Sequence, residues 1–325
     1  MNQWEVFKAK TVELIFFGNY FYALCVVSLA IESSMQQSIA LNNVYFYIFL
    51  ASSTIAYYTY AYQGKIHLFF FEKSSISLLP ENYVFRNPRT RWYHRNQKLI
   101  GVTQTFFIFL VLISALVLII FKFKDIFSLK LYEWLLLLST PFVAGLYYGK
   151  GIFPKLKFDL RKTGWLKPFV IGFVWAMTVS IYPVMFHEWE LHRHFEPDFF
   201  SFWLFVKNFM YISVLAIMFD IKDYVDDANQ GLKTFVVRVG LRKTIFYIIL
   251  PLTVIGLLAF TIFAFASSFS LGQYLFNLIP FVLLLFVTYN FKKRKSIFYY
   301  LAIIDGLMLL KGVCGIVAVL IFNPQ

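Results

Sequence analysis

Long apolar stretches separated by short polar connections dominate this chain of 325 residues. A helix needs about 20 predominantly apolar residues to cross a lipid bilayer, and nine stretches come near that length. Their approximate bounds are 14–31, 44–71, 99–121, 131–148, 169–186, 199–219, 245–266, 274–291 and 297–322. The composition agrees, because 60% of the residues are hydrophobic and only 14% are charged, whereas about 25% are charged in soluble domains. We therefore expect an integral membrane protein.

The apolar stretches are predicted to be helices rather than strands of a β-barrel. Barrel strands are about ten residues long and alternate between apolar and polar side chains, whereas these stretches are apolar on all sides. The longest connections on the predicted cytoplasmic side, 72–98 and 149–168, read as loops and not as soluble domains. We expect an all-α, polytopic membrane protein in which residues 1–325 form one domain with nine transmembrane helices.

The formal net charge of +13 is explained by membrane topology and does not require a nucleic-acid partner. Basic residues concentrate in every second connection, including 72–98 and 149–168. By the positive-inside rule these connections face the cytoplasm. This places the N-terminus in the cytoplasm and, after nine crossings, the C-terminus outside. The expected location is the lipid bilayer of the plasma (inner) membrane, with attraction to anionic lipid as a by-product and with no nucleic acid bound.

One acidic segment stands out at the end of the sixth stretch, FDIKDYVDDANQGLKT at 219–234. Asp220, Asp223 and Asp227 follow an i, i+3, i+7 spacing that places them on one helix face, whereas Asp226 projects elsewhere. A solvated helix end could carry such a face, although three neighbouring carboxylates repel one another. The functional alternative is a Mg²⁺ site, because hard carboxylate oxygens bind Mg²⁺ and bridge it to substrate phosphates.

The sequence DIKDYVDDANQGLKTFVVRVG resembles the second aspartate-rich motif of the UbiA superfamily of intramembrane aromatic prenyltransferases. That motif runs D-x-x-D-x-x-x-D and continues with Gly, Thr and a second Gly. The positions that match it in order are Asp220, Asp223, Asp227, Gly231, Thr234 and Gly240. A weaker likeness covers residues 148–175, where Tyr, Pro and basic residues resemble those after the family's fourth helix. The resemblance implies nine helices around a central cavity, with the aspartate motifs at the cytoplasmic ends of the second and sixth helices.

The family's first motif, N-D-x-x-D-x-x-x-D, is missing near the end of the second stretch, where the chain reads YYTYAYQGKIHLFFFEKSS. Between residues 57 and 98 the only acidic residues are Glu72 and Glu81, and neither has a second carboxylate at helical spacing. The second motif also differs in one place, since Phe219 precedes its first aspartate where the family often has Asn. Half of the family's metal site is therefore not matched.

Basic residues offer a substitute for the missing motif. The connection that lacks the aspartates contains RNPRTRWYHR, in which Arg89 and Arg91 are candidates to bind a diphosphate, because guanidinium groups bind phosphate oxygens directly. Such loops are also expected to be basic for topological reasons alone. Lys155, Lys157 and Arg161 are further candidates for phosphate contact, since they lie in the next cytoplasmic loop, where the weaker likeness falls.

The resemblance implies a Mg²⁺-dependent prenyltransferase that uses a prenyl diphosphate and a lipophilic acceptor, with Asp220, Asp223 and Asp227 as the catalytic, metal-binding residues. The alternative is a catalytically degenerate member that binds an isoprenoid or another lipid, or transports it. Asp305 and Lys311 in the last stretch bear on this, because intramembrane charges usually face a cavity. Lys311 could line that cavity, or its side chain could extend to the outer interface.

Overall fold

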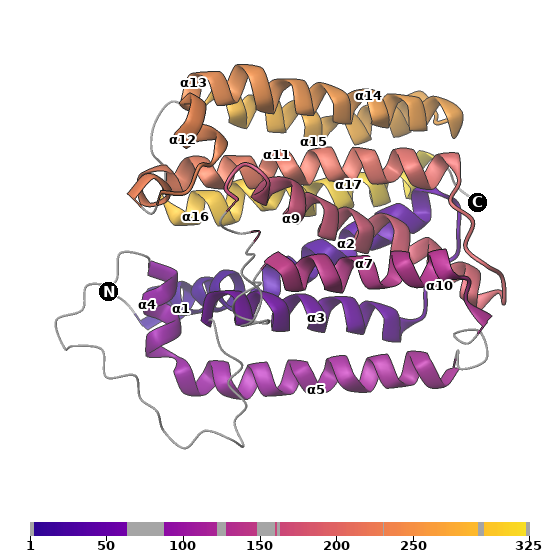
Figure 1. The fold of residues 1–325 in the computed structure, drawn as a ribbon, viewed down its shortest axis with the longest axis horizontal. Coiled ribbons are helices and arrows are strands. Elements are labelled where there is room, and N and C mark those ends of the chain that lie inside the picture. Colours follow the sequence, from indigo (N-terminus) through magenta and orange to yellow (C-terminus); the bar gives the residue numbers. More distant parts are fainter. Residues whose placement is uncertain are drawn as a thin grey trace. The chain divides into compact units, whose positions relative to one another are not determined.

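The computed structural model describes residues 3–63, 88–121, 128–147, 160, 163–229, 231–291 and 296–322. The regular structure of these ranges is helical throughout (Figure 1), which confirms the predicted all-α class. The chain divides into two compact units. Unit 1 comprises Met1–Leu24 and Asn43–Phe121, and unit 2 comprises Cys25–Asn42 and Lys122–Gln325. The boundary between the units falls inside helix α2 (Tyr20–Gln36).

The described residues of unit 1 form four helices besides the start of α2. They are α1 (Gln3–Phe17), α3 (Val44–Gln63), α4 (Pro88–Arg95) and α5 (Gln97–Phe121). The chain bends by 55° between α1 and α2. Asn19 lies at this bend with φ of 69°, a left-handed conformation that Asn tolerates better than most residues. Within unit 1, α3 packs along α5, and α4 contacts α1, α3 and α5.

Unit 2 is organised around one long helix. The α-helices of this unit after α2 are α7 (Leu131–Tyr147), α9 (Lys167–Ala176), α10 (Tyr182–Glu190), α11 (Phe199–Asn229), α12 (Phe235–Val239), α13 (Leu241–Thr244), α14 (Leu250–Ala266), α15 (Leu271–Tyr289), α16 (Ile297–Tyr299) and α17 (Gly306–Phe322). Short π-helical segments make α9 continuous with α10, α13 with α14, and α16 with α17. Helix α11 packs against α9 and α14, while α15 packs against α17 (Figure 1).

Six of the described helices are long and apolar enough to cross a membrane. They are Gln97–Ile120, Lys167–Glu190, Phe199–Asn229, Leu241–Ala266, Leu271–Tyr289 and Ile297–Phe322, and the bent pair of α1 and α2 would be a seventh. Of the other two predicted stretches, α7 has only 17 residues. Helix α3 contains six tyrosines and is not among the six. The described residues thus supply six candidate membrane-crossing helices, or seven with the bent pair, and the predicted count of nine is not confirmed.

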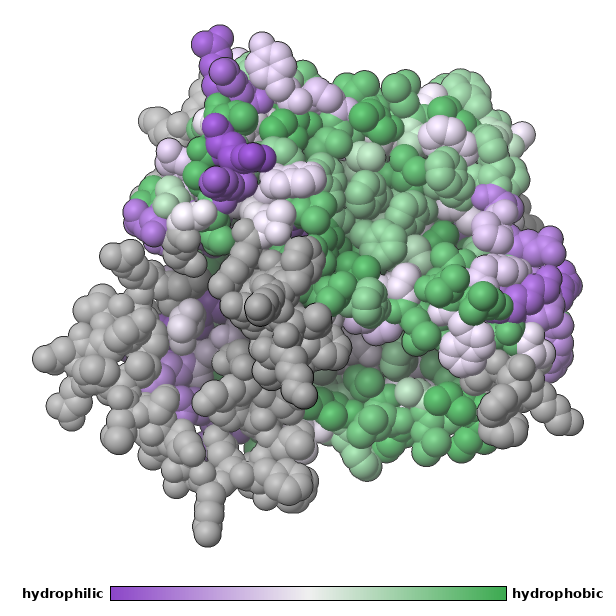
Figure 2. Space-filling model, in the orientation of Figure 1, coloured by the Kyte–Doolittle hydropathy of each residue, from purple (hydrophilic) through white to green (hydrophobic). Residues whose placement is uncertain are grey.

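Apolar side chains form much of the visible surface of unit 2. In Figure 2 they cover the middle of this unit, and polar side chains gather near α12 and α13 at one end and near the α10–α11 connection at the other. Leu258, Phe265 and Phe286 are examples of large apolar residues that are exposed. Apolar surface between polar ends suits contact with acyl chains, in agreement with an integral membrane protein.

Candidate functional site

The acidic segment lies at the end of α11, which extends ten residues beyond the predicted end of the sixth stretch, to Asn229. Gly231 then ends the helix in a left-handed conformation, with φ of 69°. Its N–H donates to the carbonyl of Ala228 at 3.1 Å, and the N–H of Leu232 donates to that of Asp227 at 2.9 Å. This is the usual role of a glycine after a helix. The first glycine of the motif therefore fixes where the acidic helix stops.

The three aspartates of the motif share a face but differ in burial. Asp220 and Asp227 are buried, with 0% and 6% exposure, and the side chain of Asp223 is 38% exposed. Asp226 is exposed, as its different direction on the helix predicts. A solvated helix end therefore does not describe Asp220 and Asp227. A buried carboxylate is costly unless it is paired, so the contacts of these two residues matter.

Lys167, which the sequence analysis did not single out as a site residue, pairs with the first aspartate. Its Nζ lies 2.6 Å from Oδ1 of Asp220. Just before α9 the chain also makes a close approach at Gly164, where an added Cβ would lie 2.5 Å from the backbone of Lys233 and Thr234. A glycine at this place lets the start of α9 pack against the chain that follows the acidic helix.

Three buried oxygen atoms of the motif have no hydrogen-bond partner among the described residues: Oδ2 of Asp220, Oδ2 of Asp227 and Oγ1 of Thr234. Asp223 is different, because its Oδ1 lies 2.5 Å from Nζ of Lys222. Buried polar atoms without a partner are rare in folded proteins, and each calls for an explanation such as a bound ion or ligand. The motif thus carries acceptors that its described neighbours do not satisfy.

These acceptors suit a Mg²⁺ ion that takes its other ligands from water and substrate, and they do not form a site built from protein ligands alone. Within the described ranges, no three side chains of His, Cys, Asp or Glu converge as a metal site. Mg²⁺ commonly binds through one or two carboxylates, several waters and the phosphates of a substrate. The free oxygens of Asp220 and Asp227 match that donor set. They suit a metal that enters together with a phosphorylated ligand.

The arginine candidates lie on α4 in unit 1. Arg89 is 2% exposed, and its guanidinium donates to Oδ1 of Asn19 and, at 3.4 Å, to the carbonyl of Phe17. The same group stacks on Tyr62, 3.6 Å from the ring centroid. Arg89 therefore ties α4 to the bend between α1 and α2. Arg91, by contrast, is exposed.

Several other candidates fall outside the described residues. Lys155, Lys157 and Arg161 belong to this group, as do Glu72 and Glu81 of the connection that lacks the first motif. In the described part of that region, Asn19 donates to Oγ1 of Thr59 at 3.1 Å and to Oη of Tyr93 at 2.9 Å. The hydrogen bonds from Asn19 to Thr59 and Tyr93 thus join the bend after α1 to α3 and α4.

Comparison with known proteins identifies the family. A model of the UbiA prenyltransferase family matches residues 86–304, about two thirds of the chain. The chain belongs to this family. The match includes Asp220, Asp223 and Asp227 and confirms the resemblance seen in the sequence. A solved structure of a UbiA homolog from Archaeoglobus fulgidus bound to GPP and Mg²⁺ is also similar, with 12% identity, a TM-score of 0.49, and coverage of 95% of this chain and 100% of that one. No curated protein matches the chain.

Within this UbiA family member, sequence reasoning found the aspartates but missed the lysine that pairs with one of them. Lys167 is followed by Pro168 at the start of an apolar helix and lies in the segment of weaker family likeness. A cation at the first position of a helix is unfavourable next to the helix dipole. That conflict was a signal that Lys167 has a specific anionic partner.

Proposed function

We propose that the protein is a Mg²⁺-dependent prenyltransferase that moves a prenyl group from a prenyl diphosphate to a lipophilic acceptor. The supporting observation is the pair of buried carboxylates at the end of α11, Asp220 and Asp227, each with an oxygen that no described residue satisfies. Both belong to the region that matches the family. We assign Asp220, Asp223 and Asp227 to binding of the metal and the diphosphate.

The residues of this chain would act mainly by holding the diphosphate. Asp220 and Asp227 offer fixed, buried oxygens, and Asp223 offers a more exposed one. Bound Mg²⁺ would supply positive charge that stabilises the departing diphosphate. Lys167 holds the carboxyl group of Asp220 in place, and the described contacts occupy one of its three N–H donors. A remaining donor can bind a diphosphate oxygen.

The proposed reaction breaks the bond between C1 of the prenyl group and the diphosphate oxygen, and the electron pair leaves with the diphosphate. The acceptor then forms a bond to C1 and loses a proton. Departure of the diphosphate leaves positive charge on C1 of the prenyl group. The surrounding helices are apolar and exclude water, which would otherwise react with this prenyl cation. Arg91, Lys155, Lys157 and Arg161 remain proposed phosphate contacts. Arg89 could join them only if its contacts with Asn19 and Tyr62 opened.

We also propose a location for this site. The basic connections lie on the same predicted side as the aspartates, so the positive-inside rule places the aspartate end of α11 in the cytoplasm. The N-terminus would then be cytoplasmic and the C-terminus outside, in the plasma membrane. Two measurements in sealed vesicles test this orientation: cleavage by an added protease, and labelling of single cysteines at each end of α11 by a thiol reagent that does not cross the membrane.

The deciding experiment measures binding of a long-chain prenyl diphosphate to the purified protein in detergent, with and without Mg²⁺. Wild type is compared with Asp223→Asn and, as a matched control, with Asp226→Asn, which changes an exposed aspartate on a different helix face. We expect binding that needs Mg²⁺, is lost in Asp223→Asn and persists in Asp226→Asn. Equal losses in both variants would show that charge alone, and not the motif, is responsible.

A second candidate is a degenerate family member that binds or transports an isoprenoid lipid without transferring it. The missing first motif favours it, because the family's metal site would be only half present. Under this alternative, an isoprenoid alcohol binds as well as its diphosphate does, and Mg²⁺ has no effect. The same titration, repeated with the alcohol, separates the two functions.

A further inference from the structure

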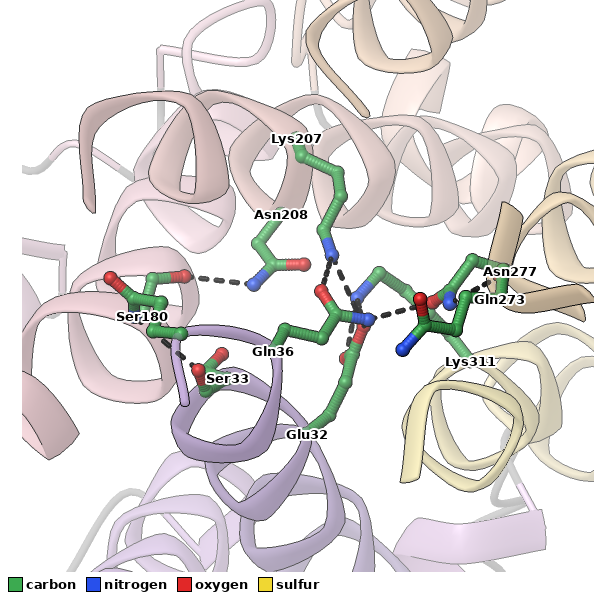
Figure 3. A network of polar contacts seen from close by, with 10 residues as sticks. Glu32, Ser33, Gln36, Ser180, Lys207, Asn208, Gln273, Asn277 and Lys311 are labelled. Carbon is green, nitrogen blue, oxygen red and sulfur yellow. Dashed lines mark hydrogen bonds and ion pairs between the residues drawn. The ribbon is translucent and has the colours of Figure 1, made fainter. Parts of the chain in front are cut away.

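Unit 2 contains a buried charge cluster formed by Glu32 of α2, Lys207 of α11 and Lys311 of α17 (Figure 3). Exposure of the three residues is 0%, 1% and 3%. Oε1 of Glu32 accepts from Nζ of Lys207 at 3.1 Å and from Nζ of Lys311 at 2.9 Å, and Oε2 accepts from Lys311 at 2.7 Å. One carboxylate thus binds two ammonium groups inside a bundle of apolar helices.

This charge cluster is unbalanced. With all three groups ionised it carries one excess positive charge, and within the described ranges no second carboxylate contacts either lysine. The other printed neighbours of the Lys207 ammonium are uncharged: Oε1 of Gln36 lies 2.7 Å from Nζ, and the ring centroids of Phe260 and Phe263 lie 5.9 and 5.8 Å away. Buried charges are tolerated when they are paired. The excess charge calls for an anion nearby.

A pocket of about 830 Å³ lies next to the charge cluster. The end of α2, the α10–α11 connection, the α14–α15 connection and the end of α17 line it, and all of these belong to unit 2. Its wall combines apolar residues, among them Phe200, Phe269 and Val319, with the amides of Gln36 and Gln273. A pocket with this mixture can hold a molecule that has both a polar group and an apolar part.

Gln36 connects the pocket to the charge cluster (Figure 3). Its Oε1 accepts from Nζ of Lys207 at 2.7 Å, and its Nε2 donates to Oε1 of Glu32 at 3.1 Å and to Oδ1 of Asn277 at 2.7 Å. Asn277 in turn donates to the carbonyl of Gln273, a second residue of the pocket wall. One side chain therefore separates Lys207 from the pocket.

The pocket is distinct from the aspartate site. Phe200 lines the pocket and Asp220 lies 20 positions later on the same helix, which corresponds to about 30 Å along α11. None of the aspartates of the motif lines the pocket. The proposed transfer reaction therefore leaves the pocket and its charge cluster unexplained.

We propose that this pocket is a second binding site, for a molecule with an anionic headgroup such as a phosphate. The headgroup would lie against Gln36 and within reach of Lys207, where it balances the excess charge, and the apolar part would lie along Phe200 and Val319. A charge-assisted hydrogen bond from the ammonium group gives the site its preference for anions. This inference does not depend on prenyl transfer.

The charges at the mouth of the pocket do not reverse this preference. Its wall includes Lys130 and Arg193 as well as Glu188, Glu196 and Asp198. Four of these side chains are exposed and the fifth, Glu188, is half-buried, so water and salt weaken their effect. Lys207 is buried, and its charge acts through a medium that screens it far less.

The test is ligand-induced stabilisation of the purified protein in an uncharged detergent, with a chelator present to remove divalent cations. Dodecyl phosphate is the probe, and dodecanol and dodecyltrimethylammonium are its uncharged and cationic counterparts. We expect dodecyl phosphate alone to raise the melting temperature in a saturable way, since a ligand that binds the folded state stabilises it. The Asp223→Asn protein should respond like wild type, which separates this site from the aspartates.

Two variants locate the response. Lys207→Met removes the excess charge, and Val319→Trp places a large apolar side chain in the pocket wall and leaves the three charged residues in place. Each should weaken the apparent affinity about tenfold or more. Lys243→Met, the same change at an exposed lysine of α13, should keep the wild-type response.

If Lys207→Met does not fold, the response of Val319→Trp decides alone. A wild-type response to inorganic phosphate as well would identify a free anion rather than an amphiphile as the ligand. No response in wild type, or a full response in Val319→Trp, would overturn the proposal.

Discussion

Nζ of Lys167 lies 2.6 Å from Oδ1 of Asp220, so the first residue of α9 neutralises a fully buried carboxylate of α11. Neither charge is favourable alone. The helix dipole opposes a cation at a helix N-terminus, and an unpaired buried carboxylate is strongly disfavoured. The pair also joins the segment of weaker family likeness to the aspartate motif. It therefore couples the stability of unit 2 to the geometry of the proposed active site.

Lys167→Met is expected to destabilise the protein by about 3 kcal/mol, the lower end of the range for breaking a buried ion pair. The lower end applies because the lysine side chain keeps 19% exposure. The double variant Lys167→Met, Asp220→Asn removes both charges and should recover most of the loss. Denaturant unfolding of the detergent-solubilised protein measures both. A double variant as unstable as the single one would mean that packing, and not charge, holds the two helices together.

Asp227→Asn is expected to reduce prenyl transfer about a hundredfold, whereas Asp226→Asn should leave it close to wild type. Asp227 is buried with a free oxygen, and its neighbour Asp226 is exposed on another face. Initial rates with a prenyl diphosphate and excess acceptor, measured at several Mg²⁺ concentrations, check this. The two substitutions are chemically identical and adjacent, so equal rates would argue against a role for the buried face.

Gly231→Ala is expected to cost about 1 kcal/mol, because φ at this position is 69° and a Cβ is unfavourable there. Gly306→Ala is the matched control. An added Cβ meets nothing within 4 Å at either position, but Gly306 begins α17 without a positive φ. Alanine there should be neutral or stabilise by up to about 1 kcal/mol. Equal effects on the free energy of unfolding would show that the left-handed turn after the aspartates is not required.

The length of the apolar stretches predicted the helices well. Every predicted stretch contains a helix in its described part, because apolar runs of this length leave the backbone few alternatives in lipid. The shared face of Asp220 and Asp227 was also predictable, since it depends only on the helical repeat. The residues at which the helices end were less predictable. Helix α11 continues past Phe219 because an acidic segment can still be helical, and its end depends on Gly231.

Contacts between helices distant in the sequence could not be predicted. Lys311 was expected to line a cavity or to extend to the interface, and the second alternative is wrong, because it binds both oxygens of Glu32 279 positions away. Glu32 itself lies one residue beyond the predicted first stretch, where a charge is unremarkable. Its role follows from the packing of α2 beside α11 and α17, which residue spacing does not encode.

Glu32→Gln is expected to be more destabilising than Lys207→Met. The first change leaves two buried ammonium groups, those of Lys207 and Lys311, without a carboxylate, at a cost of about 3–5 kcal/mol. The second leaves a balanced pair in which Lys311 still binds both oxygens of Glu32, so the loss should be about 1 kcal/mol. Unfolding of each variant in the same detergent, without added phosphate, measures the difference. The opposite order would mean that Glu32 does not hold two buried ammonium groups in the folded protein, and the argument for an excess positive charge beside the pocket would be lost.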